Sequence, residues 1–454
     1  MHMNRAVRIA IVAVLLIVIP QLFIESAIYS RIVSIAAVCL LLWISEIVPP
    51  FVPTLLLWTL VPLLLGSIDG RFSLSHVLSW AVDPVMALFF GGFVLGVATE
   101  RNGLGQRLTQ FALESSGNSF KKFLLFVILI TAFLSMWMSN IAAAALVLAC
   151  LHSVLARFED DHVLRRVLLV GVAFGADFGG MATPIGTGPN AIAIASISAT
   201  QPVSFLSWMA FAFPLTIGML IVSYVFLLWR ARESERDWKK RGAQLRTVFE
   251  KSKDEESDVV PHRISFLIIF AGTILLWLTE PLHGIPAAVI ALGSAALIFL
   301  AGVLTKKDLT RIDWSTLLLI AGGITLGRLL EQSALIKTAS ANVPFADFHP
   351  MFGLFLLCLT SAMLAALMSN TATTVLLIPL AMTLIPAPST AILIAVSASF
   401  GIPFVISTPP NAMVFGQGGV KFGDLFWPGI VLMVAGCFLV SLTGQAVLNF
   451  VGIP

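Results

Sequence analysis

The sequence contains few charged residues. Of its 454 residues, 11% are Asp, Glu, Lys or Arg, 58% are hydrophobic, and the mean hydropathy is +0.98. Because soluble domains carry about 25% charged residues, this composition excludes an ordinary soluble enzyme. The apolar residues form runs that are long enough to cross a hydrocarbon layer about 30 Å thick. The sequence therefore predicts an all-α polytopic membrane protein.

Cysteine is scarce too, and the motifs of an enzyme are missing. Each of the four cysteines stands alone in an apolar run, so the sequence contains no disulfide framework and no metal-binding pattern. The predicted spans contain no HExxH, no GxSxG and no Asp pair at helical spacing. We therefore expect no catalysis. The small net charge of +3 gives no reason to expect a nucleic-acid partner.

Hydropathy predicts eleven membrane crossings in four parts of the chain. An N-terminal helix lies in residues 1–30, and its run is too long for a typical signal peptide and lacks an A-x-A cleavage site. A first half (31–229) and a second half (263–454) flank a charged linker (230–262), which we expect to be cytoplasmic. The crossings are expected at roughly 7–27, 31–48, 51–66, 82–100, 165–198, 204–229, 263–281, 285–304, 313–330, 390–418 and 424–450.

The stretches 119–155 and 350–387 are too long for one crossing and short for two. Each has a Ser-Asn pair near its middle, so we expect re-entrant hairpins, since irregular backbone at membrane depth must be buried or line a cavity. If neither hairpin crosses, 23 of the 27 Lys and Arg residues lie on the side of the N-terminus. The positive-inside rule then predicts a cytoplasmic-membrane protein with its N-terminus in the cytoplasm and its C-terminus outside.

Four short motifs occur twice in the same order, which indicates an internal repeat. Each half contains five predicted crossings, an odd number, so the copies are expected to insert in opposite orientations. Inverted repeats with interrupted helices are typical of secondary transporters. The matched motifs are Leu42–Glu46 with Leu276–Glu280, Gly91–Gly96 with Gly322–Gly327, Met138–Ala142 with Met368–Ala372, and Gly188–Ala191 with Pro409–Ala412.

The two hairpin turns are predicted to bind an anion. Ser139-Asn140 and Ser369-Asn370 each precede a new helix, and Ser and Asn are favoured N-caps. A helix start offers free N–H groups and a partial positive charge, which suit a carboxylate. Neither turn contains Lys or Arg, so we expect a bound dianion to be balanced by these partial charges and by cations that are carried with it.

Gly- and Pro-rich segments, Gly179–Asn190 and Gly401–Asn411, interrupt two further spans. Proline removes a backbone donor and glycine permits unwinding, so free carbonyl oxygens are expected there, and these suit a monovalent cation such as sodium. Asp177 lies one turn before Gly180, well inside a predicted span. Because an intramembrane carboxylate is costly without a partner, we expect Asp177 to assist cation binding, to titrate as a proton site, or to accept a structural hydrogen bond.

These motifs are similar to the signatures of the divalent anion/sodium symporter (DASS) family. The similarity is carried by Met138-Ser-Asn140 with Thr183–Asn190, and by Met368–Thr374 with Ser407–Ala412. The resemblance covers essentially the whole chain through the repeat. It implies a homodimer of eleven-helix protomers in the lipid bilayer, each with a scaffold domain and a transport domain that moves as an elevator.

The resemblance also assigns residues to the site. Substrate contacts would fall to Ser139, Asn140, Thr187, Ser369, Asn370, Thr371 and Pro409. The first sodium position would use Ser135, Ser139, Asn140 and Gly186. The second sodium position would use Asn370 and Ser407, with backbone carbonyls around Ala365 and Met368.

The sequence departs from the family pattern at several positions. Ile141 stands where Thr is common, Ala365 lacks a hydroxyl that is frequent there, Gly188 replaces a proline, and Asp177 is acidic where a small or uncharged residue is expected. The expected function is uptake of a small dianion, such as succinate, malate or fumarate, with sodium and without an organic cofactor. The alternative is a sodium-independent dicarboxylate or tricarboxylate antiporter; a passive channel is a further reading.

Overall fold

The fold was analysed in a computed structural model, which describes residues 5–24, 26–45, 47–117, 119–198, 200–232, 238, 262–332 and 349–453. These residues form helices and no β-strand. Most of the predicted linker 230–262 lies outside the described residues, as do Glu46 and Lys337. The helical fold follows from the apolar composition, since a helix satisfies its backbone hydrogen bonds within one segment.

The N-terminal helix and the first half contain the following helices: α1 (Arg5–Phe23), α2 (Ala27–Ser45), α3 (Val52–Leu65), η1 (Gly70–Phe72), α4 (Leu74–Ala81), α5 (Pro84–Arg101), α6 (Leu104–Ser116), α7 (Phe120–Ser135), α8 (Asn140–Leu155), α9 (Val163–Met181), α10 (Gly188–Ile197) and α11 (Phe205–Ala231). The second half contains α13 (Arg263–Leu278), α14 (Glu280–His283), α15 (Ala287–Leu300), η3 (Lys306–Arg311), α16 (Trp314–Gln332), α18 (Pro350–Leu367), α19 (Asn370–Leu384), α20 (Pro388–Ala398), α21 (Pro409–Gly416) and α22 (Phe422–Phe450).

Helices are present at all the predicted spans. The spans 165–198 and 390–418 are each divided in two, as α9 with α10 and as α20 with α21. The stretches 119–155 and 350–387 each form two helices that pack together across a short turn, α7 with α8 and α18 with α19. Among the described residues, α2, α5, α11, α18 and α22 are long and apolar enough to cross a membrane. Since α18 belongs to a predicted re-entrant hairpin, the count of eleven crossings stays a prediction.

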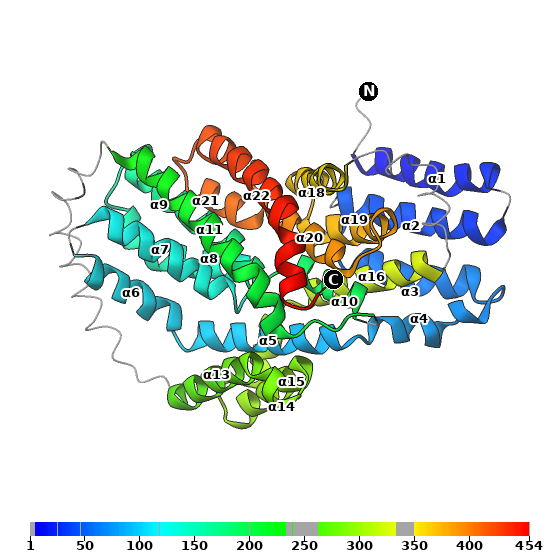
Figure 1. Cartoon of the computed structure of the whole chain (residues 1–454), viewed down its shortest axis with the longest axis horizontal. Helices are drawn as coiled ribbons and strands as arrows, with labels where there is room; N and C mark the ends of the chain where they lie inside the picture. Colours follow the sequence, from blue (N-terminus) through cyan, green and yellow to red (C-terminus); the bar gives the residue numbers. More distant parts are fainter. Residues whose placement is uncertain are drawn as a thin grey trace.

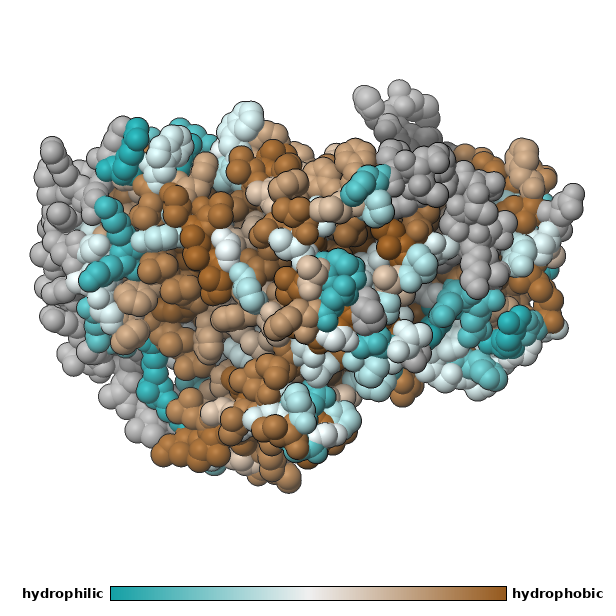
Figure 2. All heavy atoms as spheres, in the orientation of Figure 1, coloured by the Kyte–Doolittle hydropathy of each residue, from teal (hydrophilic) through white to brown (hydrophobic). Residues whose placement is uncertain are grey.

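Figure 1 shows an elongated molecule with α1–α4 at one end and α6–α9 at the other. Helices α10, α16, α19 and α20 lie between them, where the buried core is continuous. Figure 2 shows broad apolar areas on the outside of the same face. Exposed Phe213 and Val225 on α11, and Val431 and Phe438 on α22, contribute to the apolar surface of the molecule. Such a surface is expected of helices that face lipid.

In each half, the helix that carries the matched Gly-Gly motif packs closely against a helix of the other half. A Cβ atom at Gly91 of α5 would lie 2.5 Å from the carbonyl oxygen of Ala291 in α15. A Cβ atom at Gly322 of α16 would lie 2.1 Å from the hydroxyl oxygen of Thr54 in α3. Glycine is therefore required at both places by the close approach of a helix from the other half.

Candidate substrate and cation site

The first hairpin turn ends in a capped helix. Ser139 has extended backbone angles, and its hydroxyl oxygen accepts a hydrogen bond from the backbone N–H of Ala142 at 3.3 Å. The predicted N-cap is therefore present. The remaining N–H groups of the first turn of α8 are left available at the hairpin turn.

The second hairpin turn is built differently. Met368 has extended backbone angles, and Ser369 stands at the N-cap position of α19 without a side-chain capping bond. Asn370 begins the helix, and its buried Oδ1 atom has no hydrogen-bond partner among the described residues. The second turn therefore leaves an amide oxygen and a hydroxyl oxygen available to a ligand.

The two Gly/Pro-rich breaks are held by equivalent asparagines. The side-chain amide of Asn190 donates to the carbonyl oxygens of Gly180 and Thr183, at 3.2 and 2.7 Å. The amide of Asn411 donates to those of Ile402 and Phe404, at 2.8 and 3.1 Å. Both asparagines are fully buried. Each thus closes a loop whose carbonyl groups lack helical partners.

Each break is also tied to the helix that leads into its own hairpin turn. The Thr183 hydroxyl donates to the carbonyl oxygen of Met136 at 2.5 Å. The Ser407 hydroxyl donates to that of Ala366 at 3.0 Å. The breaks and the hairpin turns therefore form two similar units, one in each half.

Three of the four residues predicted for the first cation position, Ser135, Asn140 and Gly186, lie close together. Oδ1 of Asn140 accepts a hydrogen bond from the buried Ser135 hydroxyl at 2.8 Å. A Cβ atom at Gly180 would lie 2.3 Å from that Oδ1 and 3.1 Å from the carbonyl oxygen of Gly186. Ser139 precedes Asn140 directly and uses its oxygen as the α8 cap. Amide, hydroxyl and carbonyl oxygens thus converge here, and such ligands suit a hard cation.

The predicted second position lacks one of these oxygens. Ala365, buried at the end of α18, has no hydroxyl to offer to Oδ1 of Asn370, which explains why this oxygen is unpartnered. The Ser407 oxygen accepts from the backbone N–H of Phe404 at 2.9 Å. The amide oxygen of Asn370 is thus available without displacement of a protein donor.

A cavity of about 940 Å³ lies between the two turns and the two breaks. Its described lining contains no Lys, Arg or His, and its charged members are Asp177 and Asp313. Ser135 and Ala365 do not line it and lie behind the turns. The predicted site residues that do line the cavity are Ser139, Asn140, Asp177, Gly186, Thr187, Met368, Ser369, Asn370, Thr371, Ser407 and Pro409.

Gly188, which departs from the family pattern, contacts the other half. A Cβ atom there would lie 2.3 Å from the hydroxyl oxygen of Thr371. In the repeat, Pro409 matches Gly188, and Ile141 matches Thr371. Pro409 and Ile141 both line the cavity, and Ile141 is 46% exposed. One side of the site therefore offers a hydroxyl where the other offers an apolar side chain.

Asp177 is buried at 2% exposure and joins the two halves. Its Oδ2 atom accepts a hydrogen bond from the hydroxyl of Thr408 at 3.0 Å. Thr408 is the N-cap of α21, where its hydroxyl oxygen also accepts from the backbone N–H of Asn411. A structural hydrogen bond, one of the three expected roles of Asp177, is therefore present.

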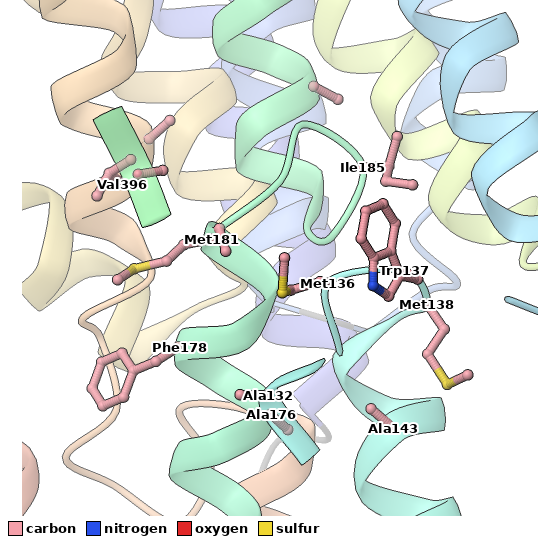
Figure 3. Packing of buried hydrophobic residues seen from close by; sticks show 14 of the residues in the cluster. Ala132, Met136, Trp137, Met138, Ala143, Ala176, Phe178, Met181, Ile185 and Val396 are labelled. Atoms are coloured by element: carbon pink, nitrogen blue, oxygen red, sulfur yellow. The ribbon is translucent and has the colours of Figure 1, made fainter. Parts of the chain in front are cut away.

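The two hairpin turns differ in their packing. Trp137 of the first turn stacks on Phe205 of α11 and on Trp277 of α13, with ring planes within 5°. Figure 3 shows Trp137 between Met136 and Met138 at this turn. In the second half, Leu367 beside the turn is 64% exposed and Ile406 of the break is 78% exposed. The first turn is thus packed against α13, and the second is open.

The cavity includes residues to which the sequence analysis assigned no role in the site. Trp43 of α2 and Phe89 of α5 line it, as do Asp313 and Thr316 at the start of α16. Trp43 belongs to one repeated motif and Phe89 precedes another, so the repeat was the signal that could have pointed to them. Nothing in the local sequence of Asp313 indicated that it faces the site.

Comparison with known proteins finds membrane transporters. A sequence profile described as citrate transporter matches residues 40–392. An uncharacterized transporter of Haemophilus influenzae is 30% identical over 436 residues, which cover 90% of each chain. A sodium-dependent dicarboxylate transporter of Staphylococcus saprophyticus is 24% identical over 431 residues, covering 86% of this chain and 82% of that protein.

A solved structure shares the fold. The structure of Neisseria gonorrhoeae MtrF, described as illuminating a class of antimetabolite efflux pumps, matches with a TM-score of 0.54 at 12% identity. The match covers 88% of this chain and 96% of that chain. With the family profile and the sodium-dependent relatives, the DASS-type resemblance is confirmed. The chain belongs to the citrate transporter family, and it is a membrane transporter and not an enzyme.

Proposed function

We propose that the protein is a secondary active transporter that takes up a small divalent anion, a four-carbon dicarboxylate, together with sodium. The main observation behind this proposal is the cavity that the first residues of α8 and α19 line together. Its described lining contains no basic side chain. Helix N-termini supply only partial positive charge. A dianion bound there is balanced by monovalent cations that bind with it.

The substrate would lie between the two turns. One carboxylate would contact Ser369, Asn370 and Thr371, and the other would contact Ser139 and Asn140. Thr187 and Pro409 stand at the starts of α10 and α21, where they line the same cavity. Because Ile141 has no hydroxyl, the second carboxylate has one donor fewer than the first.

Sodium would bind behind each turn. The first ion would be held by Ser135, Ser139, Asn140 and Gly186. The second would be held by Asn370 and Ser407 with backbone oxygens near Ala365 and Met368. The convergence of oxygens around Asn140 and the unpartnered Oδ1 of Asn370 support these positions.

Uptake of labelled succinate into proteoliposomes tests this function. We expect saturable accumulation that requires an inward sodium gradient and proceeds without internal dicarboxylate. Uptake that does not depend on sodium but requires internal dicarboxylate would instead indicate a dicarboxylate antiporter. Uptake that never exceeds the equilibrium level would indicate a passive channel.

Transport would proceed by an elevator movement within each protomer of a homodimer. In the proposed cycle the two hairpins move together past α2, α13 and α16. The first turn, which is packed in this structure, then becomes open, and the second turn becomes packed. The different packing of Trp137 and Leu367 supports this alternation. Mass determination in detergent tests the dimer: a monomer at all concentrations would exclude it.

The predicted topology places the protein in the cell membrane with a cytoplasmic N-terminus and an external C-terminus. Long-range ion pairs support the grouping of residues on one side of the membrane, because each joins residues that are expected on the same side. Asp424 pairs with Arg166 and Arg230, and Arg311 pairs with Glu100. Labelling of a cysteine introduced at Gly452 with a membrane-impermeant maleimide in intact cells tests the external end.

A further inference from the structure

A shallow groove between α9 and α11 combines basic and apolar side chains. Helices α9 and α11 pack together at the end of the molecule that carries α6–α9 (Figure 1). The charged residues of this α9–α11 groove are Arg166 of α9, Arg230 of α11 and Asp424 of α22. Two guanidinium groups and one carboxylate leave one net positive charge. The rest of its described lining is apolar and consists of Val163, Val167, Val170, Phe226 and Leu227.

Asp424 cannot satisfy both arginines. Its Oδ1 atom accepts hydrogen bonds from Arg166 at 3.3 Å and from the guanidinium of Arg230. Its Oδ2 atom accepts from Arg166 at 3.0 Å and from the backbone N–H of Lys421 at 2.9 Å. These four bonds occupy the acceptor sites of an ionised carboxylate. The buried Nε–H of Arg166 has no acceptor among the described residues, and because an unpaired buried donor is costly, a further acceptor is expected here.

The neighbouring arginine, Arg165, is satisfied by the protein itself. Its guanidinium donates to the carbonyl oxygens of Gly418 and Gln417, at 2.6 and 2.7 Å. It also pairs with the carboxylate of Asp160 at 3.3 Å. Arg165 thus holds the chain that follows α21 against the start of α9. Arg166, in contrast, keeps a donor for a ligand.

Trp229 places the groove near the membrane surface. Its side chain is 57% exposed, and the guanidinium carbon of Arg232 lies 5.8 Å from its ring centroid. Exposed Trp side chains are enriched at the level of the lipid headgroups. The exposed side chains of Ile221 and Val225 precede Trp229 on α11 and suit the acyl region. In the proposed topology this end of α11 is cytoplasmic, and the cytoplasmic leaflet is rich in anionic lipid.

The size of the groove favours a lipid headgroup over a free solute. Its volume of about 10 Å³ is close to the least that holds one water molecule. The groove therefore accepts a single phosphate oxygen but cannot enclose a whole solute. A lipid phosphate needs no enclosure, because the bilayer holds its acyl chains. Guanidinium groups also match the geometry of phosphate oxygens.

We propose that the α9–α11 groove binds the headgroup of an anionic phospholipid. One phosphate oxygen would accept from the Nε–H of Arg166, and a second would accept from Arg230. One acyl chain would follow the apolar lining of the groove into the bilayer. The phosphate charge would neutralise the one net positive charge that Asp424 leaves. This site is separate from the substrate cavity, and its occupancy does not depend on which anion is transported.

The proposed lipid would brace the helices that carry the substrate site. Helix α9 leads into the Gly179–Asn190 break, and α22 follows the break and helix α21 of the second half. Asp424 lies in the first turn of α22. A phosphate shared by Arg166 and Arg230 would therefore fasten α9, α11 and α22 to one another. We expect anionic lipid to stabilise the folded protein.

Thermal unfolding of the purified protein in detergent tests the site. Phosphatidylglycerol should raise the unfolding temperature of the wild type more than phosphatidylcholine with the same acyl chains. This difference should disappear in Arg166→Gln and in Arg230→Gln. It should persist in Lys122→Gln, which removes a basic residue of α7 outside the groove. Since Arg230 is exposed, its variant still tests the groove if Arg166→Gln does not fold.

A loss of the ion pairs alone would lower the unfolding temperature equally in both lipids. An undiminished difference between the lipids in Arg230→Gln overturns the proposal. Equal stabilisation of the wild type by the two lipids, or an equal loss of the difference in Lys122→Gln, also overturns it, because neither result depends on the groove.

Native mass spectrometry measures binding directly. The wild type and Lys122→Gln should retain phosphatidylglycerol with similar affinity, and Arg230→Gln should bind it roughly fivefold more weakly. Inorganic phosphate without lipid should not raise the unfolding temperature of the wild type. If inorganic phosphate stabilises the protein as strongly as phosphatidylglycerol does, the groove is a site for a free anion and the lipid assignment is wrong.

Discussion

At the scale of single residues, Asn140 and Asn370 occupy matching places but have different partners. Oδ1 of Asn140 accepts from Ser135, whereas Oδ1 of Asn370 has no described donor. The carbonyl oxygen of Ala176 lies 2.7 Å from the Ser135 hydroxyl, so the single hydroxyl hydrogen has a second acceptor when Oδ1 of Asn140 binds a ligand. Their shared property is that both residues line the cavity.

We therefore predict that Asn140→Ala and Asn370→Ala each abolish dicarboxylate uptake and leave the protein folded. Each substitution removes a proposed ligand of both substrate and sodium. Uptake into proteoliposomes measures the loss, and size-exclusion chromatography with thermal unfolding checks the fold. Near-normal transport by both variants would contradict the proposed site.

Gly188 gives a prediction about substrate affinity. The Cβ atom of an alanine would lie 2.3 Å from the Thr371 hydroxyl oxygen, so Thr371 must move. Overpacking of this kind costs about 1–3 kcal/mol, and about 1.4 kcal/mol corresponds to a tenfold change in affinity. We expect Gly188→Ala to raise the KM for dicarboxylate roughly tenfold.

The control for that measurement is Gly218→Ala in α11, where a Cβ atom meets nothing within 4 Å. The KM of this variant should match the wild type. An unchanged KM in Gly188→Ala would show that Thr371 does not bind substrate from its observed position.

At the scale of helices, the two hairpin turns differ in capping. Ser139 caps α8 through its side chain, whereas Ser369 makes no such bond to α19. Loss of a side-chain cap costs about 1 kcal/mol. We predict that Ser139→Ala lowers the temperature of unfolding in the absence of ligands and that Ser369→Ala does not, although both weaken dicarboxylate binding. Equal unfolding temperatures for the two variants would contradict this difference.

The helices also show how far sequence reasoning reaches. Hydropathy predicted the spans because apolar runs of membrane length have few alternative structures. It missed α6, whose Gln106, Arg107 and Gln110 give it no apolar run, and α4, which has only eight residues. The Ser-Asn turns and the Gly/Pro breaks were predicted because they interrupt apolar runs and occur twice.

Contacts between distant residues were beyond this reasoning. Thr408 and Asp177 are separated by 231 positions, and no periodicity in one sequence reports their pairing. Asp313 enters the cavity because the halves pack against each other, and not because of its neighbours in the chain. The residue types at the site were thus predictable, whereas their partners depended on how the halves come together.

At the scale of the whole molecule, the packed turn and the open turn should exchange during transport. Trp137 and Trp277 lie with ring centroids 6.2 Å apart. In the repeat, Leu367 matches Trp137, and Trp43 matches Trp277. We predict that Leu367 approaches Trp43 in the second conformation, while Trp137 leaves Trp277.

Disulfide cross-linking tests this exchange in a variant whose native cysteines are replaced. The pair Trp137→Cys with Trp277→Cys should be joined in the resting protein by a bis-methanethiosulfonate reagent, which spans the distance left when the two stacked indole rings are removed. The pair Trp43→Cys with Leu367→Cys should cross-link only during turnover with sodium and dicarboxylate, and each bond should stop uptake until it is reduced. If the second pair never cross-links while transport continues, the proposed exchange is wrong.

The stack of Trp137, Phe205 and Trp277 gives the protein a built-in optical signal. Two nearly parallel indole rings at this separation couple their electronic transitions, so the pair contributes to near-ultraviolet circular dichroism and alters intrinsic fluorescence. A movement that separates Trp137 from Trp277 changes both signals without an attached dye. Stopped-flow spectroscopy of the unmodified protein can therefore measure separately the rate at which Trp137 leaves Trp277 and the rate at which it returns. Steady-state flux measurements give only one overall rate for the two steps.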